Sequence, residues 1–222
     1  MKPDIEELYR KETLRIEAFS DGIFCVAITL LAIEIGTEVK NNATNIELAK
    51  SLAALWPKYL AYFISFVNVL LAWIGHHSLF KNFRDADGFV MISNGILMML
   101  VALVPFPTKT LGIFLNTGAF KTATIFYTGY FVLISAGFKL LWYAASRKRN
   151  LLAHHVTNKQ VNQITRNENI GLVCNIIIFL FAFINPWAAL ILSFVMWIYW
   201  MLPGNQINVV ISIFSKFKNS LS

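Results

Sequence analysis

The residues best able to do chemistry stand at the two ends of one apolar segment. Arg15, Ser20 and Asp21 precede or open the run GIFCVAITLLAI, and Glu34 follows it. A carboxylate at the centre of a helix in lipid costs about 2.5–3.5 kcal/mol, and less towards the interface. Asp21 therefore either finds hydrogen-bond donors inside the protein or serves as a proton relay or direct ion site. Both interpretations stay open on this segment alone.

Donors for Asp21 occur in two later apolar segments. Trp73 and His77 stand near the end of one, and Asn94 stands near the start of the next. If consecutive segments run in opposite directions, these side chains reach the same depth as Ser20 and Asp21. We therefore expect them to face the polar end of the first segment.

An apolar stripe runs along the same first segment. Placed at about 100° per residue, its members fall within about 40° of one line, and Asp21 points roughly to the opposite side. The stripe consists of Arg15, Phe19, Gly22, Val26, Leu30 and Ile33, with Thr29 beside it. Such a stripe usually packs against another helix or lipid. The alternative is a hydrophobic constriction of a pore, which requires an oligomer because one helix cannot form a ring.

No motif for an enzyme or a metal site accompanies these residues. His76 and His77 are adjacent, so on a helix they point about 100° apart and cannot chelate one ion. Cys25 and Cys174 lie far apart in apolar segments, and we expect two buried thiols. The sequence offers no nucleophile–base pair or phosphate loop, so we predict no catalytic activity and no cofactor.

The composition places these residues in a membrane. Of the 222 residues 57% are hydrophobic and only 14% are charged, with a mean hydropathy of +0.59, whereas a soluble domain carries about a quarter charged residues. The net charge of +7 is spread between apolar segments, so it indicates orientation in the bilayer and no nucleic-acid partner. The charged first residues lack the core of a signal peptide.

Six apolar segments are candidates for membrane helices, each of which needs about 20 residues. They cover about 17–36, 57–76, 88–106, 123–145, 169–184 and 187–202. Pro105 and Pro107 mark the end of the third, and Asn185-Pro186 predicts the turn between the last two. We predict an all-α integral membrane protein with one six-span domain over 1–204, whose first helix covers about 14–36. Residues 205–222 form a cytoplasmic tail or an interfacial segment.

The distribution of Lys and Arg predicts the orientation. Thirteen fall on the side of both termini and five on the other, while Lys139 lies within the fourth span. Cytoplasmic loops carry the excess of positive charge, so both termini are expected in the cytoplasm.

The polar start of the first segment resembles a known signature. Arg15-x-x-x-Phe19-Ser20-Asp21, followed by an apolar run with Thr29-Leu30, is similar to the R-x-x-x-F-S-D motif of the transmembrane protein 175 family of potassium-selective channels. One copy of the motif on six spans resembles the prokaryotic members. The resemblance implies a homotetramer in the cell membrane, K⁺ as the permeant ion, no re-entrant selectivity filter, and the first helix lining a central pore.

The resemblance also implies roles for single residues. Val26, Leu30 and Ile33 would form the pore constriction, with Val26 smaller than the isoleucine or leucine that is narrowest in the family. Thr29 would contribute to selectivity. Helical spacing, apart from the resemblance, puts Glu34 about 80° off the stripe at the outer end, where it would either enrich cations at the mouth or face lipid or the interface. A structural polar network would comprise Arg15, Phe19, Ser20, Asp21, Trp73, His77 and Asn94.

Two functions follow from these predictions. The first is a leak-like, potassium-selective channel whose partners are its own copies and membrane lipids. The second is a proton-coupled secondary transporter with Asp21 and His77 as a relay. Duplicated halves and helices interrupted at the midplane are common in transporters. Neither is evident in this sequence.

Overall fold

The computed structural model describes residues 5–36 and 43–201, with side chains described from 12 to 196 outside that gap. Over these residues the protein is helical, which confirms the predicted all-α class. The helices are α1 (Ile5–Ile33), α2 (Asn45–Ala54), α3 (Trp56–Phe80), α4 (Gly88–Ala102), α5 (Pro105–Phe114), α6 (Phe120–Ser146), α7 (Asn158–Ile184) and α8 (Pro186–Met201). The predicted segment 205–222 lies outside the described residues.

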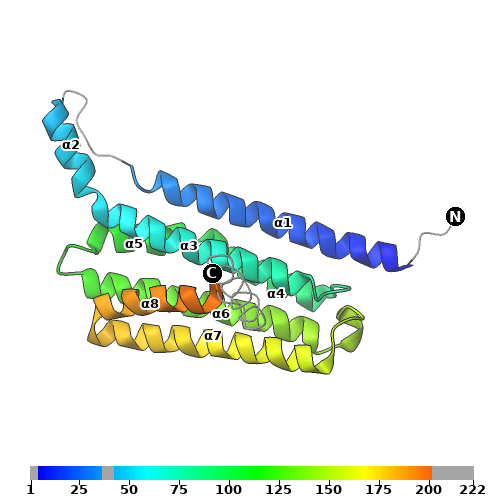
Figure 1. The fold of residues 1–222 in the computed structure, drawn as a ribbon. Coiled ribbons are helices and arrows are strands. Elements are labelled where there is room, and N and C mark those ends of the chain that lie inside the picture. Colours follow the sequence, from blue (N-terminus) through cyan, green and yellow to red (C-terminus); the bar gives the residue numbers. More distant parts are fainter. Residues whose placement is uncertain (1–4, 37–42, 202–222) are drawn as a thin grey trace, which may run out of the picture.

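Five segments of the described chain are long and apolar enough to cross a membrane. They are Glu12–Ile33, Trp56–Phe80, Gly88–Phe114, Phe120–Ser146 and Asn158–Ile184, and a shorter apolar helix follows at Pro186–Met196. These helices lie side by side in an elongated bundle, while α2 stands off from its end (Figure 1). Helix α3 packs between α1 and α5, and α6 packs against α4, α5 and α7.

Helix α1 is attached to the bundle by one face only. Phe24, Ala27 and Leu31 are buried in the main hydrophobic core together with Val69 of α3 and Val90 of α4. Their spacing of three and four residues is that of a single helical face. The rest of α1 is free to face other surroundings.

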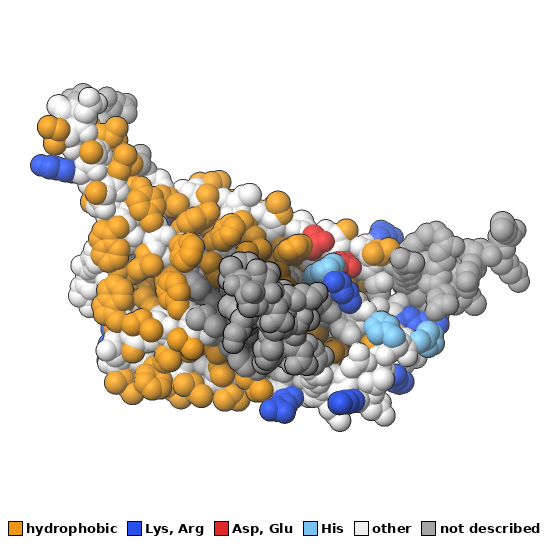
Figure 2. Space-filling model, in the orientation of Figure 1, with side chains coloured by type: hydrophobic (Ala, Val, Ile, Leu, Met, Phe, Trp, Pro, Cys, Tyr) orange, Lys and Arg blue, Asp and Glu red, His pale blue; other side chains and the backbone are white. Residues whose placement is uncertain are grey.

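Most basic side chains gather towards one end of the bundle, and hydrophobic side chains cover most of the other half of the face shown, next to α2 (Figure 2). We call this the basic end. It is formed by the α3–α4 and α6–α7 connections, which carry Lys81, Arg84, Arg147, Lys148 and Arg149.

The third membrane segment is longer than predicted, because its prolines do not end it. Pro105 occupies the first turn of α5, where a missing N–H costs no helical hydrogen bond. Leu103 and Val104 keep right-handed helical angles between the two pieces. The segment therefore continues to Phe114.

Two helix starts were missed because polar residues hid them. Helix α7 begins at Asn158 rather than near 169, and its start is a capping box of Thr157 and Gln160. The same arrangement of Thr44 and Glu47 starts α2, which has no buried residue. The pattern of Ser or Thr followed three residues later by Glu or Gln marks such starts.

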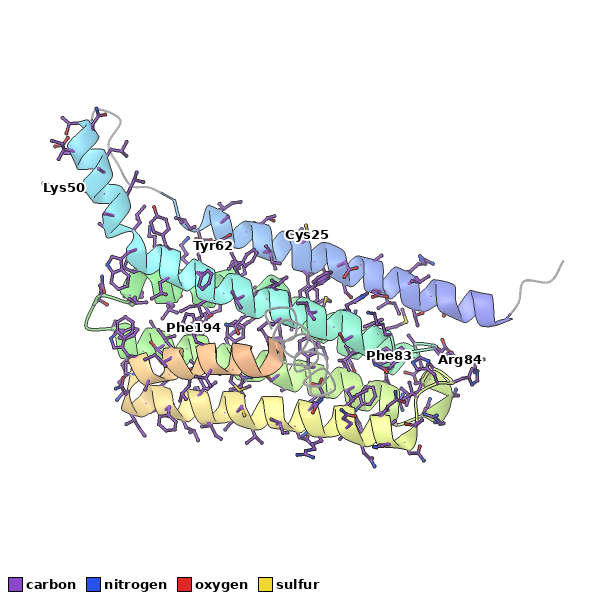
Figure 3. The ribbon with its side chains drawn as sticks, in the orientation of Figure 1. Cys25, Lys50, Tyr62, Phe83, Arg84 and Phe194 are labelled. Carbon is purple, nitrogen blue, oxygen red and sulfur yellow. The ribbon has the colours of Figure 1, made fainter. Side chains whose placement is uncertain are left out.

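The prediction of two buried thiols is wrong. Cys174 is half-buried, and Cys25 is exposed on the outer side of α1 (Figure 3). An apolar segment gives a cysteine an apolar environment, but that environment does not have to lie inside its own subunit.

Candidate functional site

A buried chain of hydrogen bonds joins α1, α3 and α4. Asn94 donates through Nδ2 to Ser20 Oγ at 2.9 Å, and its Oδ1 lies 2.8 Å from His76 Nε2. Ser20 in turn donates to the carbonyl of Ile16 at 2.8 Å. All three side chains are at most 2% exposed. Because Asn94 Oδ1 can only accept, His76 carries its hydrogen on Nε2.

His76 is also held by aromatic rings. It stacks on Phe80 with ring centroids 4.4 Å apart and lies 5.5 Å from the ring of Phe24 on α1. Its Nδ1 is buried and has no hydrogen-bond partner among the described residues. The imidazole therefore links α3 to α4 through one hydrogen bond that it donates, and it packs against α1 through Phe24.

Two further polar contacts form successive rungs between α1 and α3. Trp73 donates its indole N–H to Asp21 at 2.8 Å, and His77 Nδ1 lies 2.6 Å from Glu17 Oε1. Glu17 and Asp21 are four residues apart on α1, and Trp73 and His77 are four residues apart on α3. The two contacts are therefore one helical turn apart on both helices. Asp21 thus has a protein donor, as a carboxylate at the edge of a membrane requires.

The structure brings together most but not all of the predicted network. Ser20, Asp21, Trp73, His77 and Asn94 lie in these contacts, although His77 contacts Glu17 instead of Asp21. Arg15 and Phe19 lie outside the network on the exposed face of α1, and the Phe19 side chain is 63% exposed.

Sequence reasoning missed Glu17 and His76. Glu17 stands one helical turn before Asp21, and Trp73 stands one turn before His77. Because both intervals are four residues, the sequence could have predicted the second contact, between Glu17 and His77. The buried His76 gave no such signal, because its neighbour His77 looked equally suited to the network.

The predicted apolar stripe is the uncovered face of α1. Val26 is 56% exposed, Leu30 40% and Ile33 72%, whereas Phe24, Ala27 and Leu31 on the opposite face are at most 1% exposed. Thr29 is exposed beside the stripe and donates its hydroxyl hydrogen to the carbonyl of Val26 at 2.9 Å. The oxygen lone pairs of Thr29 therefore remain available to a cation.

Glu34 is ion-paired at the far end of α1. Its carboxylate lies 2.8 Å from Lys109 Nζ of α5, and both side chains are partly exposed. The two expected positions of Glu34, at a pore mouth or in lipid, do not include this partner. The pair fixes α1 at the end opposite the polar network and offsets the charge of Glu34.

The described residues contain no group of three or more His, Cys, Asp or Glu side chains that could hold a metal ion. The polar groups of the site are instead committed to holding α1 against α3 and α4.

Comparisons with known proteins identify the relatives of this chain. Residues 15–105 match the family described as endosomal/lysosomal potassium channel TMEM175. A potassium channel of Chamaesiphon minutus is 37% identical over 90% of this chain and 99% of its own length. A potassium channel of Streptomyces collinus is 36% identical over 63% of this chain and 68% of its own length.

The fold agrees with these relatives. The crystal structure of a lysosomal potassium-selective channel TMEM175 homolog from Chamaesiphon minutus superposes with a TM-score of 0.77 at 37% identity. The match covers 86% of this chain and 97% of that chain.

Proposed function

Because this chain belongs to the TMEM175 family of potassium channels, we propose that it is a potassium-selective channel whose conducting path is lined by the exposed stripe of α1. The observation that carries this proposal is the one-sided attachment of α1. Its inner face is buried in the subunit, and Val26, Leu30 and Ile33 are left uncovered.

Assembly as a homotetramer would give that stripe its partners. Small residues are exposed on α1 within the stripe, at Gly22, and beside it, and small residues let membrane helices approach closely. They are Ala18, Gly22, Cys25 and Ala32. Copies of α1 around one axis would bring the apolar side chains into a ring, which resists ion passage when it is narrow enough to exclude water.

Thr29 is the proposed selectivity residue. Its hydroxyl oxygen would replace part of the hydration shell of K⁺, as oxygen ligands do in selective pores. The polar rungs would keep the helix at a fixed rotation, so that Thr29 and the stripe face the axis. No cofactor is needed for this passive mechanism.

The membrane topology completes the proposal. Helix α8 would be the sixth membrane helix, shorter than the others, and α4 with α5 would form a single span. The basic end would face the cytoplasm of a cell membrane, with both termini on that side.

A proton-coupled transporter is less well supported by the same contacts. Asp21 accepts a hydrogen bond from the indole of Trp73, which is a donor only and cannot pass a proton on. His77 pairs with Glu17, one turn away from Asp21. The two groups of the predicted relay are therefore not directly joined.

Flux through proteoliposomes tests the channel proposal. Leu30→Ala should raise passive K⁺ flux because it widens the ring, and Thr29→Ala should reduce the preference for K⁺ over Na⁺. Leu180→Ala is a matched control, since Leu180 is 55% exposed on α7. Unchanged flux and selectivity in both α1 variants, or uphill transport driven by a pH gradient, would overturn the assignment.

A further inference from the structure

A separate cavity lies on the far side of α3 from the polar network. Its volume is about 130 Å³, and its walls come from α3, α6, α7 and α8, with no residue of α1. The apolar part of the wall includes Leu71, Ala72, Phe131, Ile134, Phe138 and Leu172. A cavity of about 150 Å³ holds a benzene ring, so this slightly smaller one sets an upper limit of about that size and suits a short alkyl chain or a small ring.

The polar part of the cavity wall offers two hydrogen-bond acceptors, on Glu168 and Asn175. Glu168 lines the cavity, and no hydrogen bond or ion pair joins its carboxyl group to another described residue. Asn175 donates its amide hydrogens to Ser135 Oγ at 2.8 Å and to the carbonyl of Gly171 at 3.1 Å. The Oδ1 atom of Asn175 is therefore left as an acceptor.

Several other polar groups in the wall are already engaged. Thr128 donates to the carbonyl of Thr124 at 2.8 Å, and Ser193 donates to the carbonyl of Ala189 at 3.1 Å. Tyr127 Oη lies 3.0 Å from the Oγ atom of Ser65, a residue outside the wall. The Glu168 carboxyl group and Asn175 Oδ1 thus remain in the wall as acceptors for a ligand.

We propose that this cavity is a binding site for a small lipophilic amine, whose ammonium group pairs with Glu168 and whose apolar body lies among the surrounding rings and aliphatic chains. A carboxylate in an apolar wall is stabilised by a cation at hydrogen-bond distance. An amine supplies that cation and can also donate to Asn175 Oδ1. An alcohol of the same shape supplies no charge, and a carboxylic acid is repelled.

The site is independent of the conducting path, so its test does not depend on channel activity. Binding of n-butylamine and of 1-butanol, which share a short alkyl chain and differ in the polar head group, to the full-length protein in nanodiscs is measured by ligand-observed NMR. We expect the amine to bind about tenfold more tightly than the alcohol, because charge-assisted hydrogen bonds are the stronger ones.

Three variants test whether the probes bind in this cavity, next to Glu168. Glu168→Gln should remove the preference for the amine, while Glu47→Gln on the exposed helix α2 should keep it. Ala72→Leu narrows the cavity from α3 and should weaken binding of both probes.

Three results would overturn the proposal. They are equal affinities of the two probes for the unmodified protein, an amine preference that persists in Glu168→Gln, or unchanged binding in Ala72→Leu. If Glu168→Gln fails to fold, the wild-type comparison and Ala72→Leu still decide the question.

Discussion

Asn94 is the residue on which the buried network depends. It is 2% exposed and satisfies Ser20 on one side and His76 on the other. An amide can do this because it carries a donor and an acceptor on one planar group. A leucine or alanine at this position would leave both neighbours buried without their partner.

We expect Asn94→Ala to lower the free energy of unfolding by about 1–3 kcal/mol, the cost of leaving a buried polar group unsatisfied. Thermal unfolding in detergent measures this against Asn162→Ala, which removes an exposed asparagine from α7. Equal stability of the two variants would show that the network contributes nothing to holding the helices together.

The Glu34–Lys109 pair offers a second test at the scale of residues. Lys109→Gln frees the carboxylate of Glu34, which lies 2.8 Å from Lys109 Nζ in the native protein. If Glu34 stands at the pore mouth, which is one of its two expected positions, its freed charge concentrates cations there, and salt screens the effect over about 10 Å at 0.1 M. K⁺ flux should therefore rise in Lys109→Gln at low ionic strength and return to the native rate at high ionic strength.

Lys121→Gln is the control, because Lys121 is an exposed lysine at the start of α6. The same gain in flux from Lys121→Gln would mean that net charge, rather than Glu34, causes the effect.

At the scale of elements, Asp87 holds the start of α4 and links it to the end of α6. Its side chain accepts from the backbone N–H groups of Phe89 and Val90 at 3.1 Å, and from Arg147 at 2.6 Å and Lys148 at 3.0 Å. Burial raises the pKa of Asp87, but these hydrogen bonds and charges outweigh it, so the pKa lies below its ordinary value.

A lowered pKa in the folded state stabilises the protein above the pKa of the unfolded state, about 4. That stabilisation is lost as the pH falls through the lower folded-state pKa. Asp87→Asn keeps the cap but removes the charge, so its melting temperature should lie below that of the native protein at pH 7 and approach it below pH 4.

Asp87→Ala removes the cap as well and should cost about 1 kcal/mol more at any pH. Melting curves of both variants from pH 3 to pH 7 measure the two contributions separately. A constant difference between the native protein and Asp87→Asn over this range would contradict the ionic part of the account.

The elements were predictable where one physical signal dominated. Uninterrupted apolar runs predicted α3, α6 and α8 to within a few residues because hydrocarbon length sets their size. The start of α7 and the whole of α2 were not predicted, because their sequences are too polar to form an apolar run. The capping boxes at Thr157 and Thr44 start these helices instead. Pro105 was interpreted as a stop, although a proline in the first turn of a helix is tolerated.

For the site, helical spacing predicted that the polar residues and the apolar stripe of α1 lie on different faces of the helix. It separated Asp21 from Val26, Leu30 and Ile33, and the structure buries one side and exposes the other. Spacing could not predict Lys109 as the partner of Glu34, because that contact depends on how α5 continues past its prolines.

At the scale of the whole molecule, the proposed channel requires more than one copy of the chain. Its bundle surrounds a core and a cavity, while the apolar stripe of α1 lies outside both. In the proposed topology, the basic residues at one end would orient the bundle in a bilayer, and the exposed small residues of α1 would permit close contact with another copy. In the proposed channel, conduction is a property of the assembly, and the attachment of α1 is a property of the single subunit.

Chemical modification of the stripe tests this central claim most directly. Leu30→Cys and, as the control, Leu180→Cys are made in a background with Cys25→Ser and Cys174→Ser. Potassium flux is then followed before and after addition of a positively charged methanethiosulfonate reagent. The account predicts that modification blocks flux in Leu30→Cys and leaves Leu180→Cys unaffected. Full labelling of Leu30→Cys without loss of flux would contradict it.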